Sequence, residues 1–115
     1  MTRPLFATLL CLSMAACVAG NEPTVPPFAG SITTRSFTTV ADHVYGNITV
    51  ATGPACEQQI VFWIDSRTTR LVRRDGGMIS VDSLSIGRSV SVEYSGGAAL
   101  SCPAQTGAEA VILER

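Results

Sequence analysis

The sequence contains no lysine. All eight basic residues are arginine, and nine aspartate and glutamate residues outnumber them. If Arg3 is removed with an N-terminal leader, seven arginines face nine carboxylates, which leaves a net charge of −2. Domains that bind nucleic acid present a basic surface that neutralises phosphates. The charge balance therefore argues against a nucleic-acid partner.

Residues typical of catalysis or metal binding are also scarce. His43 is the single histidine, it follows Asp42, and no serine stands in a recognisable nucleophile motif. A metal site would need further ligands at suitable spacing around His43, and the sequence offers one acidic neighbour. We therefore expect no enzymatic activity, no metal and no cofactor, and we expect His43 to be a solvated turn residue.

No apolar run in the sequence is long enough to span a membrane. The run from Leu5 to Ala19 is interrupted by hydroxyl residues and falls short of the roughly 20 residues that a span requires. Residues 1–16 instead combine a positive charge at Arg3, an apolar stretch and the small residues Ala15 and Ala16. This combination is typical of a secretory signal peptide.

The segment Met14-Ala15-Ala16-Cys17 resembles the lipobox of bacterial lipoproteins, in which small residues precede a cysteine that becomes lipidated. The resemblance implies that Cys17 carries acyl chains. Such chains would hold the protein at a membrane, because each methylene buried in the bilayer contributes about 0.8 kcal/mol to binding. The alternative is ordinary secretory cleavage after Gly20. Residues 17–29 are rich in proline and polar residues, so we expect a lipidated cysteine followed by an extended tether.

Residues 30–115 show no helical periodicity longer than about two turns. Short segments with period-two alternation, separated by turn signals, favour an all-β fold. With five principal strands, the best fit is a small five-stranded antiparallel barrel with at most one short helical turn, at Asp82–Ile86 with Asp82 as its N-cap. The five principal strands are predicted at Ile32–Val40, Val44–Ala51, Gln58–Asp65, Arg88–Ser95 and Ala108–Glu114. A short continuation of the third is predicted at Thr69–Arg74, and a further short strand at Met78–Val81.

The C-terminal part of the chain carries a resemblance to a known family. It combines spaced apolar residues, glycine turns and a closing strand: Leu84, Gly87, Val90, Val92, Gly96-Gly97, Ser101-Cys102-Pro103-Ala104-Gln105 and Ala108-Glu109-Ala110-Val111-Ile112. This pattern is similar to that of a family of small OB-fold domains of unknown function found in secreted bacterial proteins, many of them lipoproteins. The chain departs from the family at Cys102, where an aromatic residue is expected. The resemblance implies an OB-like barrel and export, and it implies no activity.

Two cysteines remain once the leader and the lipid site are set aside. Cys56 and Cys102 form an even pair in a chain that is expected to be exported, which predicts a disulfide. In the chain-entropy model, closing a loop of this length contributes about 4 kcal/mol to stability. A redox or metal-binding pair is the weaker alternative because the sequence has no C-x-x-C motif.

Aromatic and arginine residues of the middle segment form the predicted ligand site. On an OB barrel, ligands commonly bind the face of the second and third strands, where Tyr45 and Trp63 are expected. Arginine suits phosphate, carboxylate or acidic polysaccharide groups because its planar guanidinium donates parallel hydrogen bonds. The predicted site therefore comprises Tyr45, Trp63, Arg67, Arg70 and Arg73. The simpler interpretation of the arginines is a solvated face that balances nearby aspartates.

Two functional classes follow from these expectations. The first is a lipid-anchored binding module for an extracytoplasmic anionic ligand or an envelope protein. The second is a structural or accessory envelope lipoprotein that has no small ligand and acts through a sheet edge. In both cases we expect the protein to be exported and held at the membrane of the cell envelope, and the alternative is a soluble secreted or periplasmic protein.

The lipobox interpretation predicts the mature N-terminus. Mass spectrometry of the membrane-bound protein is expected to find a chain that begins at Cys17 and carries the added mass of acyl groups. A soluble mature form that begins at Asn21 would contradict lipidation.

Overall fold

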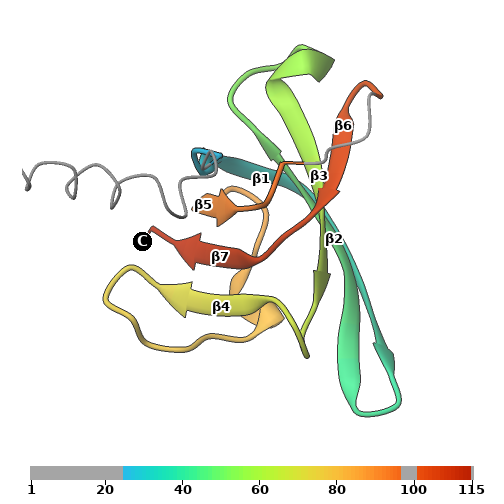
Figure 1. Ribbon diagram of the computed structural model, residues 1–115, viewed down its shortest axis with the longest axis vertical. Coiled ribbons are helices and arrows are strands. Elements are labelled where there is room, and N and C mark those ends of the chain that lie inside the picture. The colour runs from blue at the N-terminus through green and yellow to red at the C-terminus, as the bar shows by residue number, and fades with distance from the viewer. Residues whose placement is uncertain (1–24, 97–100, 115) are drawn as a thin grey trace, which may run out of the picture.

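The computed structural model describes residues 25–96 and 101–114, and within them the protein is all-β. Its elements are seven strands and two 3-10 turns (Figure 1). None of the helical segments in the described residues is long and apolar enough to cross a bilayer. In chain order the elements are β1 (Phe28–Val40), β2 (His43–Ala51), η2 (Cys56–Gln58), β3 (Gln59–Asp65), β4 (Arg70–Arg73), η3 (Val81–Ser83), β5 (Ser89–Glu93), β6 (Ala104–Gly107) and β7 (Ala110–Leu113).

The long hairpin β1–β2 is the largest feature of the fold, and in Figure 1 its tip extends beyond the rest of the molecule. Its two-residue loop pairs Val40 with His43, and Ala41 in this loop has a φ of 54°. Such short loops need positive φ so that their twist matches the twist of the flanking strands. Between Ile32 and Thr34 the register shifts, so β1 contains one extra residue relative to β2.

The seven strands form one mixed sheet in the order β4-β7-β5-β1-β2-β3-β6. Five of its strands follow the five principal predicted strands within a few residues, and β4 follows the predicted continuation at Thr69–Arg74. The expected five-stranded antiparallel barrel is not confirmed. The pairs β3–β6 and β4–β7 are parallel, and β4 and β6 stand at the two ends of the strand order. Figure 1 shows β4, β5 and β7 running across the direction of β2 and β3.

Three local predictions also differ from the structure. The strand expected at Met78–Val81 is reduced to a single bridge between Val72 and Met78. The described residues contain two helical turns, η2 and η3, where at most one was expected. The N-cap of η3 is Ser80, not Asp82, because the Ser80 hydroxyl accepts a hydrogen bond from the backbone N–H of Asp82 at 3.3 Å.

The C-terminal strands β6 and β7 are separated by the two residues Ala108 and Glu109. At this break the chain passes from the edge of the sheet, where β6 pairs with β3, to the position between β4 and β5 that β7 occupies. The N–H of Ala108 donates to the carbonyl of Trp63 in β3 at 2.9 Å, whereas the N–H of Glu109 donates to the carbonyl of Glu93 in β5 at 2.8 Å. The carbonyl of Ala108 accepts a further hydrogen bond from the buried hydroxyl of Thr69 at 2.9 Å. The break is therefore fixed on both sides.

The core lies between the inner faces of these strands and is built around Phe62, which is fully buried. Its ring lies 6.0 Å from the ring of Phe28 and 5.5 Å from that of Tyr94. The contact explains why β1 begins at Phe28, two residues before the expected start of the domain, since the ring of Phe28 is part of the core. Other fully buried members are Ile32, Ile48, Val50, Ile64, Leu84, Val90, Val92 and Val111.

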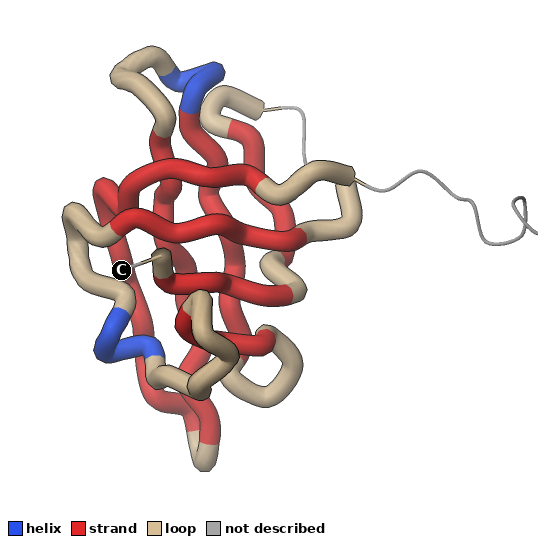
Figure 2. The backbone as a smooth tube through the Cα atoms, turned by 90° about the vertical axis from the view of Figure 1, so that its left-hand side faces the viewer, coloured by secondary structure: helices blue, strands red, loops and turns tan. Residues whose placement is uncertain are grey.

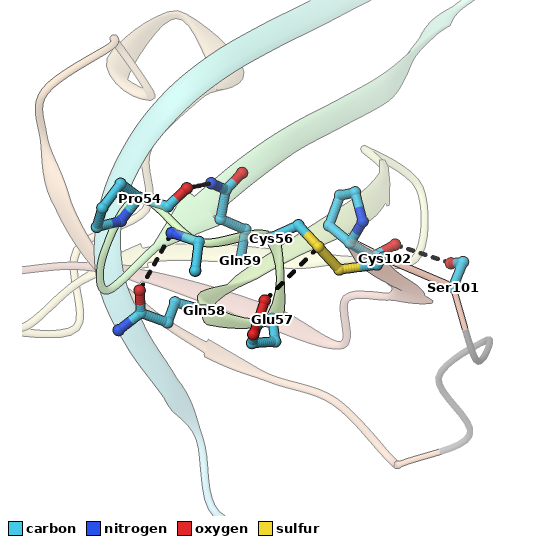
Figure 3. Close-up of a disulfide and its surroundings, with 9 residues drawn as sticks. Pro54, Cys56, Glu57, Gln58, Gln59, Ser101 and Cys102 are labelled. Carbon is cyan, nitrogen blue, oxygen red and sulfur yellow. Dashed lines mark hydrogen bonds between the residues drawn. A yellow bond between two sulfur atoms is a disulfide. The ribbon is translucent and has the colours of Figure 1, made fainter.

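A disulfide joins Cys56 of η2 to Cys102, as predicted from the cysteine pair (Figure 3). The two Cα atoms are 5.4 Å apart and 46 positions apart in sequence. Because Cys102 lies just ahead of β6, the bond holds this short strand against the loop that precedes its partner β3. The predicted lipid site Cys17 and the signal peptide lie outside the described residues.

The two strands of the hairpin approach closely at Gly46, which predicts how the methyl group of an alanine at this position would affect stability. A Cβ added to Gly46 would collide with the carbonyl oxygen of Ser36 and lie 2.7 Å from the Cα of Phe37. We expect Gly46→Ala to lower the free energy of unfolding by about 1–3 kcal/mol, the usual cost of overpacking. Denaturant unfolding measures the loss. Gly107→Ala in β6 is the control, because its Cβ would meet no heavy atom of the described chain within 4 Å; equal effects of the two substitutions would contradict the packing.

Candidate functional site

Tyr45 and Trp63 lie together on the outer face of the sheet. Their neighbours along β2 and β3, including Ile48, Phe62 and Ile64, are fully buried, so alternation directs the two aromatic side chains outward. The rings stack with centroids 5.6 Å apart and planes inclined by 26°. Tyr45 is 43% exposed. The pair forms a stacked aromatic surface on the outer face of β2 and β3.

Polar groups next to these rings are engaged with one another. The indole N–H of Trp63 donates to the side-chain oxygen of Gln105 in β6 at 3.2 Å. Asp65 lies directly opposite Tyr45 in the register of β2 and β3. The aromatic surface is therefore bordered by an amide on one side and a carboxylate on the other.

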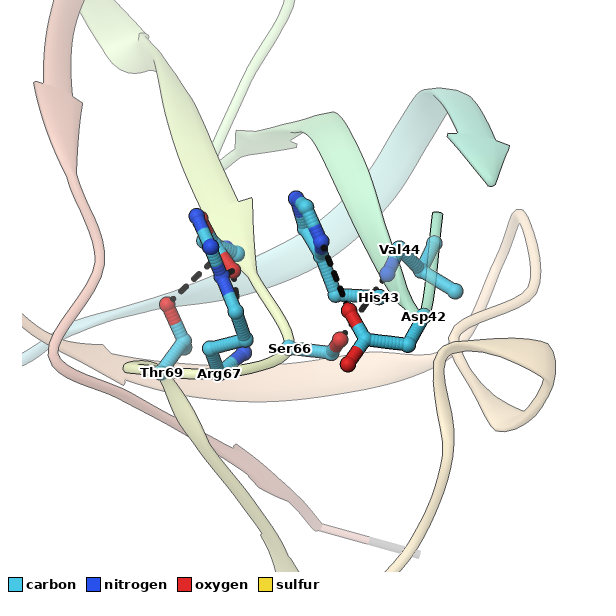
Figure 4. A network of polar contacts seen from close by, with 7 residues as sticks. Asp42, His43, Val44, Ser66, Arg67 and Thr69 are labelled. Carbon is cyan, nitrogen blue, oxygen red and sulfur yellow. Dashed lines mark hydrogen bonds and ion pairs between the residues drawn. The ribbon is translucent and has the colours of Figure 1, made fainter. Parts of the chain in front are cut away.

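Arg67 joins this outer face, but its guanidinium is already occupied (Figure 4). It donates from Nε to Asp65 Oδ1 at 3.1 Å and from NH2 to Asp65 Oδ2 at 2.8 Å, and its backbone N–H donates to Oδ1 at 2.9 Å. The side-chain hydrogen bond from Arg67 is the main reason why the pKa of Asp65 falls from 3.8 to about 2. Because this pair already provides the guanidinium with a counter-charge, an external anion would have to compete with Asp65.

Arg70 and Arg73 do not converge with the aromatic pair. Both lie on β4, which β7, β5, β1 and β2 separate from β3 in the sheet. Arg70 NH2 is 3.5 Å from a carboxylate oxygen of Glu93, and Arg73 Nε is 3.8 Å from one of Asp75. Arg70 and Arg73 therefore lie on a strand that pairs with β7 and not with β3.

The surroundings of His43 also differ from the expectation. Its side chain is 12% exposed, so it is not the solvated turn residue that we expected. Its Nδ1 is buried without a hydrogen-bond partner among the described residues, and the nearest carboxylate oxygen, of the exposed Asp42, is 3.6 Å away. The hydroxyl of the neighbouring Ser66 accepts a hydrogen bond from the backbone N–H of Val44 at 2.9 Å. His43 therefore packs beside the base of the hairpin loop.

A groove that the sequence did not predict lies between the β1–β2 hairpin and the segment 78–82, with a cavity volume of about 590 Å³. We call it the hairpin groove. One wall carries Arg35, Phe37 and Thr39 of β1, and the other carries Met78 and the residues that follow it. Met78 is 78% exposed, which is unusual for a large apolar side chain.

Arg35 is one of three charged residues that line the hairpin groove, together with Arg70 and Asp82. Its NH2 donates to the backbone carbonyl of Val81 at 3.0 Å, and its guanidinium carbon lies 5.1 Å above the ring of Phe37. Both partners are uncharged. Among the described residues no carboxylate forms an ion pair with Arg35, whereas Arg67, Arg70 and Arg73 each face one.

The hairpin groove could not be found from local sequence patterns because three separate segments form it. The one available signal is Phe37, a lone aromatic residue in a run of threonine and serine within β1. Beside Arg35, the groove is lined by apolar side chains, hydroxyl groups, one carboxylate and a second arginine, so it offers both contact surface and hydrogen bonds: Val44, Leu71, Ile79, Thr38, Ser66, Thr69, Ser80, Asp82 and Arg70.

Cys56, Glu57 and Cys102 are the one group of potential metal ligands close together in the described residues, with ligand atoms within 4.8 Å of one another. The two cysteines are bonded to each other, so they offer no thiolate to a metal. Glu57 alone does not form a metal site. The group is a disulfide with a neighbouring carboxylate.

Comparison with known proteins finds no relative: no family model, no curated protein and no solved structure matches this chain. The function must therefore be inferred from the geometry of the described residues. The similarity to the OB-fold family of secreted bacterial proteins stays a prediction.

The pair formed by Asp65 and Arg67 predicts a defined pH dependence. Because the pKa of Asp65 is depressed in the folded protein, its contribution to stability is present above pH of about 4 and is lost as the pH falls toward about 2. In Arg67→Ala the pKa of Asp65 is expected to rise toward 3.8, which a titration of the carboxyl carbon by NMR measures directly. Arg74→Ala, which removes the partner of Glu114, should leave the Asp65 titration unchanged. A pKa of about 2 that persists in Arg67→Ala would contradict the assigned cause.

Proposed function

We propose that this protein is an exported, lipid-anchored binding module, and that it holds an extracytoplasmic anionic ligand or a protein partner in the hairpin groove. The observation that carries the proposal is the position of Arg35, a cation at the groove whose contacts are a carbonyl and an aromatic ring. A ligand carboxylate or phosphate would meet this charge without displacing an existing ion pair. The exposed side chain of Met78 supplies an adaptable apolar surface beside it.

The outer face is the weaker candidate for an anion. Its arginine, Arg67, already holds Asp65 through two side-chain hydrogen bonds, and a competing anion would have to replace a well-formed pair. Tyr45 and Trp63 still offer aromatic surface there. The aromatic pair is therefore assigned here to packing of the outer face, and its variants serve as controls.

An OB-like barrel remains the proposed architecture. In this interpretation β6 and β7 are two halves of one closing strand, broken at Ala108 and Glu109. Support comes from the pairing of β6 with β3 and of β7 with β5, together with the hydrogen bonds that anchor the break to Trp63 and Glu93. β1, β2, β3, β5 and the joined closing strand would make the five strands, and β4 would be an addition.

Membrane anchoring through Cys17 completes the proposal. The disulfide between Cys56 and Cys102 is consistent with an oxidising compartment outside the cytoplasm. A tether between the lipid and β1 would place the hairpin groove within reach of ligands in the cell envelope.

Substitution at Arg35 tests the proposed site. A panel of acidic oligosaccharides and acidic peptides is screened by calorimetry, and Arg35→Gln, which keeps an N–H donor for the Val81 carbonyl, is expected to weaken the best ligand about tenfold. Arg67→Ala and Tyr45→Ala on the outer face should bind like the unaltered protein. Loss of binding in these two variants but not in Arg35→Gln would move the site to the outer face. If no member of the panel binds, the protein is better described as a structural envelope lipoprotein.

A further inference from the structure

The strand β1 has a free edge along the hairpin groove. Its pairing with β5 covers Phe28 to Ser31, and Ile32 continues it by hydrogen bonds with Gly87 and Arg88. Beyond this point, within the described residues, the pairings of β1 are all with β2. About seven residues of β1 therefore present their second edge to the groove.

The hairpin geometry identifies which backbone groups point away from β2. In a hairpin with a two-residue loop, the residues that flank the loop, here Val40 and His43, exchange both of their backbone hydrogen bonds. Backbone groups then alternate along the strand, so those of Thr38 and Ser36 also face β2. The N–H and C=O groups of Thr39, Phe37 and Arg35 consequently face the free edge.

The same three residues direct their side chains into the groove. Arg35 is opposite Ile48 in the register and Phe37 is opposite Gly46, both of which are buried on the inner face of β2. Directly opposite residues project to the same face of a sheet. The groove therefore combines the free backbone groups of β1 with three side chains on its inner face: the guanidinium of Arg35, the ring of Phe37 and the hydroxyl of Thr39.

The second wall of the groove is held at a fixed position relative to this edge. Val81 begins η3 and is buried, and its carbonyl accepts the hydrogen bond from Arg35. Ile79 is held on the other side, since its N–H donates to the carbonyl of Leu71 at 3.1 Å. Figure 2 shows η3, the lower of the two blue segments, close beside a strand of the hairpin.

We propose that an extended peptide segment of a partner protein binds in the hairpin groove by adding a strand to the free edge of β1. In this arrangement an acidic side chain of the peptide meets Arg35, and an apolar side chain covers Phe37 and Met78. Alternating backbone donors and acceptors are complementary to another extended backbone, which is the basis of strand addition. The inference rests on the proposed function of the groove and specifies its ligand.

Charge distinguishes this partner from a second copy of the same chain. The edge of β1 from residue 33 to residue 40 contains no acidic side chain, so two copies paired through it would offer no carboxylate to Arg35. An inward charge on an edge strand discourages pairing with apolar edges. A partner strand that carries a matching carboxylate is selected by the same charge.

The experiment uses the mature full chain in detergent micelles and synthetic peptides of about seven residues, the length of the free edge. The peptides are acetylated and amidated, alternate threonine with valine or leucine, and carry either glutamate or glutamine at one position of the apolar row. Binding is followed by fluorescence anisotropy, and hydrogen–deuterium exchange is read at single amides. Two further versions of the peptide are N-methylated on alternate backbone amides. One version blocks the amides that point to one edge of the extended peptide, and the other blocks those that point to the opposite edge.

If strand addition is correct, the glutamate peptide binds about tenfold more tightly than the glutamine peptide, and Arg35→Gln abolishes this difference. Exchange of the amides of Arg35, Phe37 and Thr39 slows on binding. One of the two N-methylated versions loses binding and the other retains it. Thr39→Pro, which removes an edge-facing N–H, weakens binding, while Thr39→Val does not.

Other outcomes separate this inference from the proposed function. If peptides bind at the groove but the three amides exchange as before, or both N-methylated versions bind equally, strand addition is wrong and groove binding stands. If no peptide binds at about 1 mM but an acidic oligosaccharide binds in an Arg35-dependent manner, the ligand class is wrong. If neither binds, both proposals fail. Protection of the edge amides that increases with protein concentration, without peptide, identifies a second copy as the occupant.

Discussion

The fold depends on the extra residue that β1 contains between Ile32 and Thr34. Before it, β1 pairs with β5 as well as β2, and even-numbered residues such as Ile32 face the core. After it, the alternation is shifted by one position, and Arg35 and Phe37 face inward beyond the end of β5. The side chain of Thr34 meets that of Thr49 on the outer face through a hydrogen bond of 2.7 Å. One inserted residue thus divides β1 into a core-forming half and a groove-forming half.

The sequence predicted the strands in which apolar and polar residues alternate regularly, and it missed the strand that lacks this alternation. The alternation in β2 and β3 placed Ile48 and Phe62 in the core correctly, and the cysteine pair predicted the disulfide. β6 could not be recognised, because four residues that include glycine and threonine show no apolar alternation. Its parallel partner β3 is distant in sequence, and no local rule specifies such a pairing.

The residues of the predicted ligand site lie on different strands, and their arginines face carboxylates. The turn after β3 places Arg67 on Asp65, whereas the next strand, β4, pairs with β7 and carries Arg70 to Glu93. Spacing along the chain gave no indication of this separation. Each of these arginines also has a carboxylate near it, so clustering of cations in sequence did not produce a cluster of available cations. Arg35, isolated in sequence, contacts the Val81 carbonyl and the Phe37 ring and forms no ion pair within the described residues.

The position of β7 between β4 and β5 has a consequence for how this chain acquires its structure. The last strand in the sequence is an interior strand of the sheet, so β4 has no neighbour to complete it until residues 110–113 are available. Contacts of such long sequence separation form slowly and late. A chain crossing a membrane from its N-terminus would therefore remain incompletely folded, and competent for threading, until its C-terminal end has passed.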